Sequence, residues 1–155
     1  MQFCDKDSQG EQLSADAWRK ISGMFDSPGT PHLDRISVVR DFVVSMPNLQ
    51  GDKAEFYVEY IQVGTIDSTA VRFSRSPSVK LRTVFNLIKR SATEPRPAAN
   101  GGGVRAEWSI EGPVPEPHLT VDGAIRYATE LRKTARDAAT RRSAAKMLLA
   151  LNGLR

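Results

Sequence analysis

The sequence contains few of the residues from which proteins build catalytic and metal centres. Its 155 residues include one cysteine, Cys4, and two histidines, His32 and His118. A single cysteine excludes an intramolecular disulfide and a metal cluster held by cysteines. Both histidines stand in proline-containing segments, where we expect surface or loop-anchoring roles. We therefore expect no metal site and no cofactor.

Long apolar runs are absent as well. No segment approaches the ~20 consecutive apolar residues that a membrane-spanning helix needs, and residues 1–10 contain no apolar core of a signal peptide. We expect no membrane span and, for the chain as given, a cytoplasmic location. Removal of an upstream segment would leave secretion open.

The composition is that of an ordinary globular protein, with 40% hydrophobic and 26% charged residues. A chain of this length fits one domain with one core. We expect a flexible N-terminal segment over residues 1–13 and a single α+β domain over residues 14–155.

The net charge of +4 is unevenly distributed along the chain. Residues 120–155 hold eight Lys or Arg against three Asp or Glu, whereas residues 1–119 hold fourteen against fifteen. This basic segment lacks the interleaved aromatics of a single-strand binder and the spacing of a helix-turn-helix or zinc finger. We interpret it as a solvated helix face and consider nucleic-acid binding unlikely.

Four stretches alternate apolar and polar residues with a period of two, which predicts strands over 36–46, 54–66, 79–89 and 104–110. The connections over 47–52, 74–78 and 92–103 are rich in proline, glycine or serine. Connections this short favour an antiparallel meander over parallel crossovers.

Helices are predicted on both sides of this sheet. Ser14 can cap a short helix with Trp18, Ile21 and Phe25 on one face. Thr120 can cap a C-terminal helical segment, and whether Asp137 divides that segment in two stays open. Between sheet and segment, the three prolines of residues 111–118 predict an extended linker across a sheet edge. The fold class is therefore α+β, a curved antiparallel meander of about four strands packed with N-terminal and C-terminal helices.

The predicted strands differ in how apolar their two faces are. The first strand places one set of apolar residues on a single face: Ile36, Val38, Phe42, Val44 and Met46. The second is apolar on both faces, with Phe56, Val58 and Tyr60 on one side and Tyr57, Ile61 and Val63 on the other. We expect helices on the more apolar face of the sheet, while the semi-polar face suits a homodimer contact or a pocket wall.

The candidate pocket or interface residues on the semi-polar face are Asp41, Tyr57, Glu59 and Arg82. In meander order Asp41, Glu59 and Arg82 come close together. Burial beside Tyr57, Val63 and Val84 would raise the pKa of a carboxylate, as a catalytic base requires. Cross-strand ion pairs also occur as plain structural contacts, so both readings stay open.

The order of elements over residues 14–131 resembles the NTF2-like superfamily, and residues 56–60 (FYVEY) and 108–113 (WSIEGP) are similar to uncharacterised bacterial proteins of that type. The resemblance implies a cone-shaped α+β fold whose members include small-molecule enzymes, binding proteins and dimerisation modules. It transfers no catalytic residue. The long helical segment over 120–151 leaves a helix-grip fold open, in which a curved sheet holds a C-terminal helix.

Two functional hypotheses follow. The first is a noncatalytic module that binds an apolar small molecule or forms a homodimer. The second is a cofactor-independent enzyme, of isomerase or dehydratase type, with Asp41 or Glu59 as base in a pocket lined by Tyr57, Tyr60 and Trp108. A regular strand places Tyr60 on the face opposite Tyr57 and Glu59, so the enzyme ranks second.

Overall fold

The computed structural model describes residues 2–27, 29, 32–90, 108–112 and 114–155. Helices are α1 (Gln2–Ser8), α2 (Ala15–Ser22), α3 (Val121–Thr134) and α4 (Ala138–Asn152), with a 3-10 turn η1 (Glu11–Leu13) before α2. Strands are β1 (Arg35–Val44), β2 (Asn48–Gln50), β3 (Lys53–Asp67), β4 (Arg72–Lys89), β5 (Trp108–Glu111) and β6 (His118–Thr120). The predicted α+β class is confirmed.

All six strands form one open sheet in the order β5-β4-β3-β1-β6, with β2 paired to β3. Four of them, β1, β3, β4 and β5, are antiparallel neighbours. Residues 104–107 of the fourth predicted strand and the predicted connection over 92–103 lie outside the described residues, and β2 and β6 bring the sheet to six strands where about four were expected. The sheet is mixed rather than purely antiparallel, because β6 pairs with β1 in parallel. The linker after β5 thus runs from one edge of the sheet to the other, and the parallel strand at its end was not predicted.

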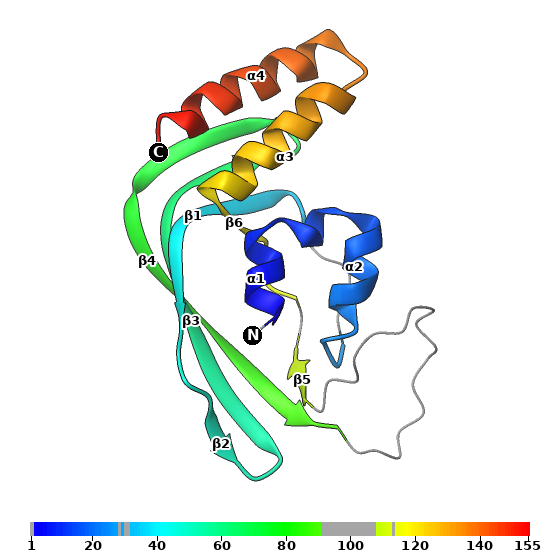
Figure 1. Cartoon of the computed structure of the whole chain (residues 1–155), viewed down its shortest axis with the longest axis vertical. Helices are drawn as coiled ribbons and strands as arrows, with labels where there is room; N and C mark the ends of the chain where they lie inside the picture. Colours follow the sequence, from blue (N-terminus) through cyan, green and yellow to red (C-terminus); the bar gives the residue numbers. More distant parts are fainter. Residues whose placement is uncertain (1, 28, 30–31, 91–107, 113) are drawn as a thin grey trace.

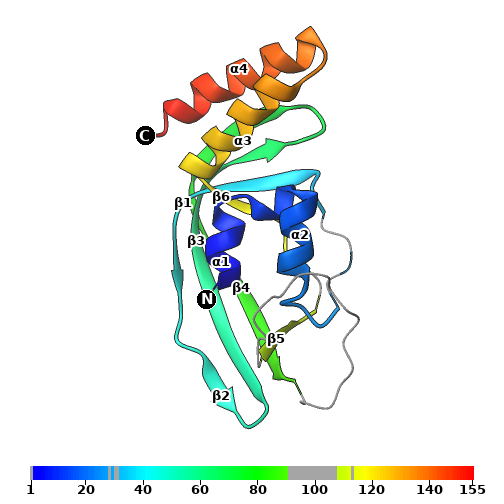
Figure 2. The same cartoon turned by 45° about the vertical axis from the view of Figure 1, so that its right-hand side comes forward.

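The sheet is strongly curved, with helices on both of its sides (Figure 1). Helices α1 and α2 lie on the concave side, whereas α3 and α4 lie across the convex side at the end where β1, β3 and β4 bend over (Figures 1 and 2). Successive residues of β1 show the same layering, since Val38 belongs to the core with α3 and α4 and Val39 to the core with α1 and α2. No described helix covers the rest of the convex face, where Val43, Tyr57 and Val84 are exposed.

The prediction of one apolar face along the first strand is wrong. The β1–β3 register shifts between Val39 and Phe42, so that β1 carries an extra residue there. A bulge of this kind reverses which side of the sheet the following residues face. Ile36 and Val38 therefore pack in the convex core, while Phe42 and Val44 pack against the concave core. Met46 lies beyond β1 and is 92% exposed.

The turn between the second and third predicted strands, which are β3 and β4, does not lie at the expected residues. The reversal lies at residues 68–71, where the Ala70 amide donates to Asp67 Oδ1 at 2.7 Å and Val71 has a φ of 49°. Residues 74–78, expected as the connection, lie inside β4. The β3–β4 register shifts there, between the pairs Gln62–Val79 and Gly64–Arg75. Proline is tolerated at such a shift because the bulged residues leave the hydrogen-bond ladder.

Helix starts follow the predicted caps. Ser14 Oγ accepts from the Ala17 amide at 3.5 Å, and Thr120 Oγ1 accepts from the Gly123 amide at 3.1 Å. Asp137 is itself a cap, since its Oδ1 accepts from the Thr140 amide at 2.8 Å. The alternative left open by the sequence is thereby resolved: Asp137 divides the C-terminal segment into α3 and α4.

Residues 2–13, the described part of the N-terminal segment for which we expected flexibility, pack against the core. They form α1 and η1 and bury Phe3, Cys4 and Asp7 to between 1% and 4% exposure. Phe3 packs edge-on against Phe25 and Phe85, with ring centroids 5.1 and 5.7 Å apart. A helix of seven residues is too short for its apolar periodicity to distinguish it from a polar tail.

Candidate functional site

The predicted site residues lie on the open convex face, where three of the four meet. Glu59 pairs with Arg82 across β3 and β4, and its carboxylate contacts Arg82 at 3.4 Å and Lys80 Nζ at 3.0 Å. The Arg82 guanidinium lies 4.3 Å from the centre of the Tyr57 ring. Asp41 is not part of this group: it sits in the β1 bulge, where its Oδ1 accepts from the Phe42 amide at 2.8 Å.

The environment of Glu59 is the opposite of the one a catalytic base needs. Hydrogen bonds from Lys80 and then Arg82 lower the pKa of this carboxyl. Val63, expected beside it, is instead buried in the core under α3 and α4. Tyr57 is 38% exposed and Tyr60 only 2%, so the two rings lie on opposite sides of β3. Glu59 is thus a solvated carboxylate held by two cations.

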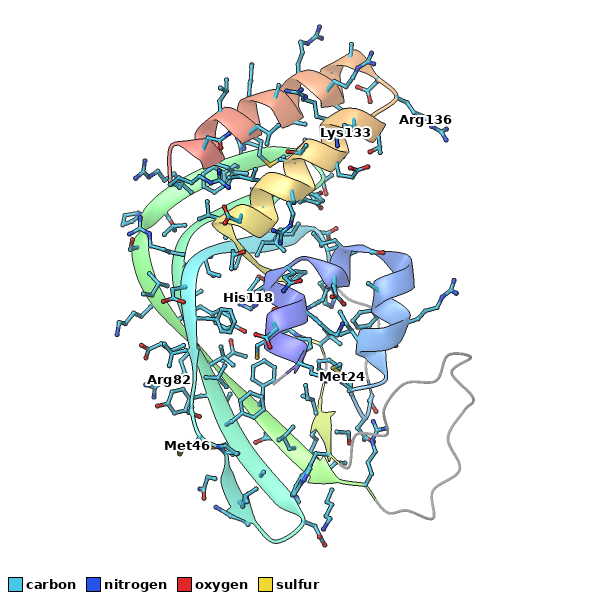
Figure 3. The ribbon with its side chains drawn as sticks, in the orientation of Figure 1. Met24, Met46, Arg82, His118, Lys133 and Arg136 are labelled. Atoms are coloured by element: carbon cyan, nitrogen blue, oxygen red, sulfur yellow. The ribbon has the colours of Figure 1, made fainter. Side chains whose placement is uncertain are left out.

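Sequence reasoning missed a polar cluster inside the concave core. Asp7 of α1 is 1% exposed, and its Oδ1 accepts from the His118 amide at 3.0 Å and from Gln12 Nε2 at 2.7 Å. Its Oδ2 lies 3.2 Å from His118 Nδ1. The His118 ring stacks on Tyr60, with centroids 4.0 Å apart and planes 6° apart. Figure 3 shows His118 beside α1, with Arg82 on the other side of the sheet.

This Asp7–His118 cluster ties the N-terminal helix to the last strand of the sheet. Thr120 Oγ1 adds a bond to the Ser8 carbonyl oxygen at 3.2 Å. Burial raises the pKa of Asp7, and also that of Tyr60, whose hydroxyl has no partner. The residues lie more than a hundred positions apart, so no spacing rule could have found them. Their close packing makes an anchoring contact, the role expected for a loop histidine.

Two hollows lie elsewhere, on the convex side. The first, of about 350 Å³, we call the bulge hollow; it is lined by Arg40, Val63, Arg75, Ser76, Pro77, Ser78 and Leu154. The second, of about 670 Å³, is lined by Arg40, Thr120, Val121, Asp122, Leu154 and Arg155. Because Arg40 and Leu154 line both, the two hollows adjoin. Neither hollow is lined by the predicted site residues.

Two of the register shifts in the sheet, one that bulges β1 and one that bulges β4, supply most of the bulge hollow. The β1 bulge presents Arg40, and the β4 bulge presents Ser76, Pro77 and Ser78. Val63 of β3 lies between them and forms the apolar floor together with Leu154, which follows α4. Bulges are common beside binding sites because they redirect side chains. The proline between two serines was the available signal, and it resembles a turn.

The basic residues of the C-terminal segment lie mainly on the outside of α3 and α4. All eight are exposed: Arg126, Arg132, Lys133, Arg136, Arg141, Arg142, Lys146 and Arg155. Figure 3 places Lys133 and Arg136 near the turn that joins the two helices. This is the solvated helix face that the charge pattern predicted.

Within the described part of the chain, no group of three or more His, Cys, Asp or Glu side chains could hold a metal ion. None of its helices combines the length and the apolar character that crossing a membrane requires. Comparison with protein-family models, with curated proteins and with solved structures gives no match.

Proposed function

We propose that this protein is a noncatalytic binding module of NTF2-like type that holds a small molecule in the bulge hollow. The observation that carries the proposal is the convergence of two bulges, in β1 and β4, around the apolar floor of Val63 and Leu154. Concave sites with an apolar floor and a few polar groups are the usual form of small-molecule sites.

The position of the helices supports the NTF2-like assignment over the helix-grip alternative. Helices α1 and α2 lie within the concave side of the curved sheet, as in a cone closed by its N-terminal helices (Figure 2). A helix-grip fold would hold its C-terminal helix there, and α3 and α4 lie on the convex side instead.

Filling the bulge hollow tests the proposal. Ser78→Trp places a large ring at the lining of the hollow, whereas Ser74→Trp places one at an exposed position of the same strand outside it. Native mass spectrometry beside a denaturing spectrum reports any retained molecule, and a screen of small molecules by thermal shift reports added ones. We expect the S74W variant to bind as the unmodified protein does and the S78W variant to lose binding. Equal binding by both variants would contradict the site.

Homodimerisation is the second candidate function, and the open convex face favours it. Several large apolar side chains there are exposed, among them Val43 at 64%, Val84 at 53% and Tyr57 at 38%. Patches of this kind mark interaction surfaces. Sedimentation equilibrium of Val84→Glu against the unmodified protein tests it: a dimer that the substitution dissociates supports this function, and a monomer in both cases removes it.

No observation favours the enzyme hypothesis with Asp41 or Glu59 as base. Neither carboxylate lines a hollow, and the pKa of Glu59 is lowered.

A further inference from the structure

We infer that the molecule held in the bulge hollow is an organic anion, a carboxylate or phosphate group on a short apolar body. The inference rests on the proposed function, because it names the chemical class of the ligand for that site. The basic side chains at the hollow lack the carboxylate neighbour that the basic side chains near Glu59 have, among the described residues.

Two guanidinium groups at the bulge hollow have no anionic partner among the described residues. Arg40 and Arg75 are both exposed and stand on the two strands that flank β3. Among the residues that the structure describes, no carboxylate lies within ion-pair distance of either one. On the same sheet Arg82 and Lys80 share Glu59. The bulge hollow therefore holds two guanidinium charges with no carboxylate beside them in the described part of the chain, whereas the two cations near Tyr57 share the carboxylate of Glu59.

The adjoining hollow brings no compensating charge. Its one lining carboxylate, Asp122, already accepts from Arg155 Nε at 3.1 Å. Arg155 and Asp122 thus neutralise each other, and the net charge of the joined hollows comes from Arg40 and Arg75. Guanidinium groups present a planar fork of donors that matches the two oxygens of a carboxylate or phosphate.

Hydroxyl groups add neutral donors beside these charges. Ser76 Oγ is buried and has no hydrogen-bond partner in the part of the chain that the structure describes, and Ser78 lines the same hollow. A buried polar atom without a partner is uncommon in folded proteins, and a ligand oxygen would satisfy it. Val63 at 3% and Leu154 at 8% exposure supply an apolar surface next to the charges. Charge and apolar floor together fit an oxyanion with a short hydrocarbon body.

The test compares probes that differ only in the head group. Hexanoate, hexyl phosphate and hexan-1-ol are titrated into the ¹⁵N-labelled protein, and amide shifts of residues 39–41, 63–64 and 75–79 are followed by NMR. We expect both anions to bind at these amides more tightly than the alcohol, by about tenfold or more, with affinity that falls as salt is added. The stronger of the two anions identifies the head group.

Charge-removing variants assign the effect to the two arginines. Arg40→Gln and Arg75→Gln are each expected to weaken anion binding by about tenfold and to leave hexan-1-ol binding unchanged. Arg72→Gln is the matched control, because Arg72 is exposed on β4 but does not line the hollow. Its anion affinity should equal that of the unmodified protein.

The outcomes separate this inference from the proposed function. Equal binding of anions and alcohol at the hollow, unaffected by R40Q and R75Q, would overturn the anion inference and leave the binding site intact. Binding of the anions at other amides would overturn it as well. If none of the three probes shifts these amides, and the S78W and S74W variants bind small molecules equally, the anion inference and the proposed binding site are both contradicted.

Discussion

Two carboxylates with basic partners lie on opposite sides of the sheet in this protein, and their pKa values shift in opposite directions. Glu59 lies on the open face between Lys80 and Arg82, and its pKa is lowered by their hydrogen bonds. Asp7 lies in the concave core against His118, and burial raises its pKa. The contribution of a hydrogen-bonded carboxylate to the free energy of unfolding therefore depends on whether it is buried. The buried one is expected to determine stability and the open one is not.

The largest expected effect comes from removing the buried carboxylate. Asp7→Ala leaves the His118 amide, the His118 ring and Gln12 Nε2 buried without their acceptor. We expect a loss of about 3 kcal/mol in the free energy of unfolding, measured by urea denaturation. A change no larger than that of an exposed substitution would show that water reaches the site and replaces the carboxylate.

The pH dependence of stability sharpens the comparison. Because burial raises the folded-state pKa of Asp7 above 3.8, the folded protein holds this proton more tightly than the unfolded chain does. The stabilisation is complete below pH 3.8 and is lost as pH rises through the folded-state pKa. Asp7→Asn keeps one oxygen acceptor but cannot ionise, so the D7N variant does not lose this stabilisation as pH rises. We expect the difference in unfolding free energy between the D7N variant and the unmodified protein to move in favour of D7N as pH rises through that window. A difference independent of pH would contradict the raised pKa.

A smaller effect is expected from the hydroxyl of Tyr60. This group is buried without a partner, so Tyr60→Phe removes an unsatisfied polar atom and keeps the ring stacked on His118. We expect a gain of about 1 kcal/mol in unfolding free energy. Tyr57→Phe on the open face is the control and should change nothing. Destabilisation by Y60F would mean that the hydroxyl has a partner in solution.

The smallest effect is expected on the open face. Glu59→Gln removes the charge that Lys80 and Arg82 share, but all three groups are in contact with solvent. We expect the urea midpoint to stay within experimental error, since exposed ion pairs contribute little. A loss of unfolding free energy as large as that of the D7A variant would contradict the expected difference between the exposed and the buried carboxylate.

Sequence patterns predicted the parts of the fold that repeat locally. Period-two alternation located β1, β3 and β4, and the capping residues Ser14 and Thr120 located helix starts. The bulges at Arg40 and at Ser76 were not predictable, because a register shift is set by pairing with another strand. They place the candidate binding residues in one hollow, away from Asp41 and Glu59.

Three of the four predicted site residues were placed correctly relative to one another, but the bulge hollow was not predicted. Alternation correctly placed Tyr57, Glu59 and Arg82 on one face, since cross-strand neighbours follow from a regular meander. Arg75 and Leu154 come together only through packing of the C-terminal end against β4, and Asp7 reaches His118 only through the folding of a terminus. Contacts between distant segments leave no periodic trace in the sequence.

The burial of β1 on both of its sides has a consequence for how the molecule opens. Residues Ile36 to Val39 are all buried, and Val38 and Val39 belong to different cores. Neither helical layer can detach without exposing this strand to water, so the two layers share one cooperative unfolding unit. The amide hydrogens of these residues should exchange with solvent only through global unfolding. Two substitutions that lower the free energy of unfolding equally, one in each core, should therefore raise this exchange rate equally.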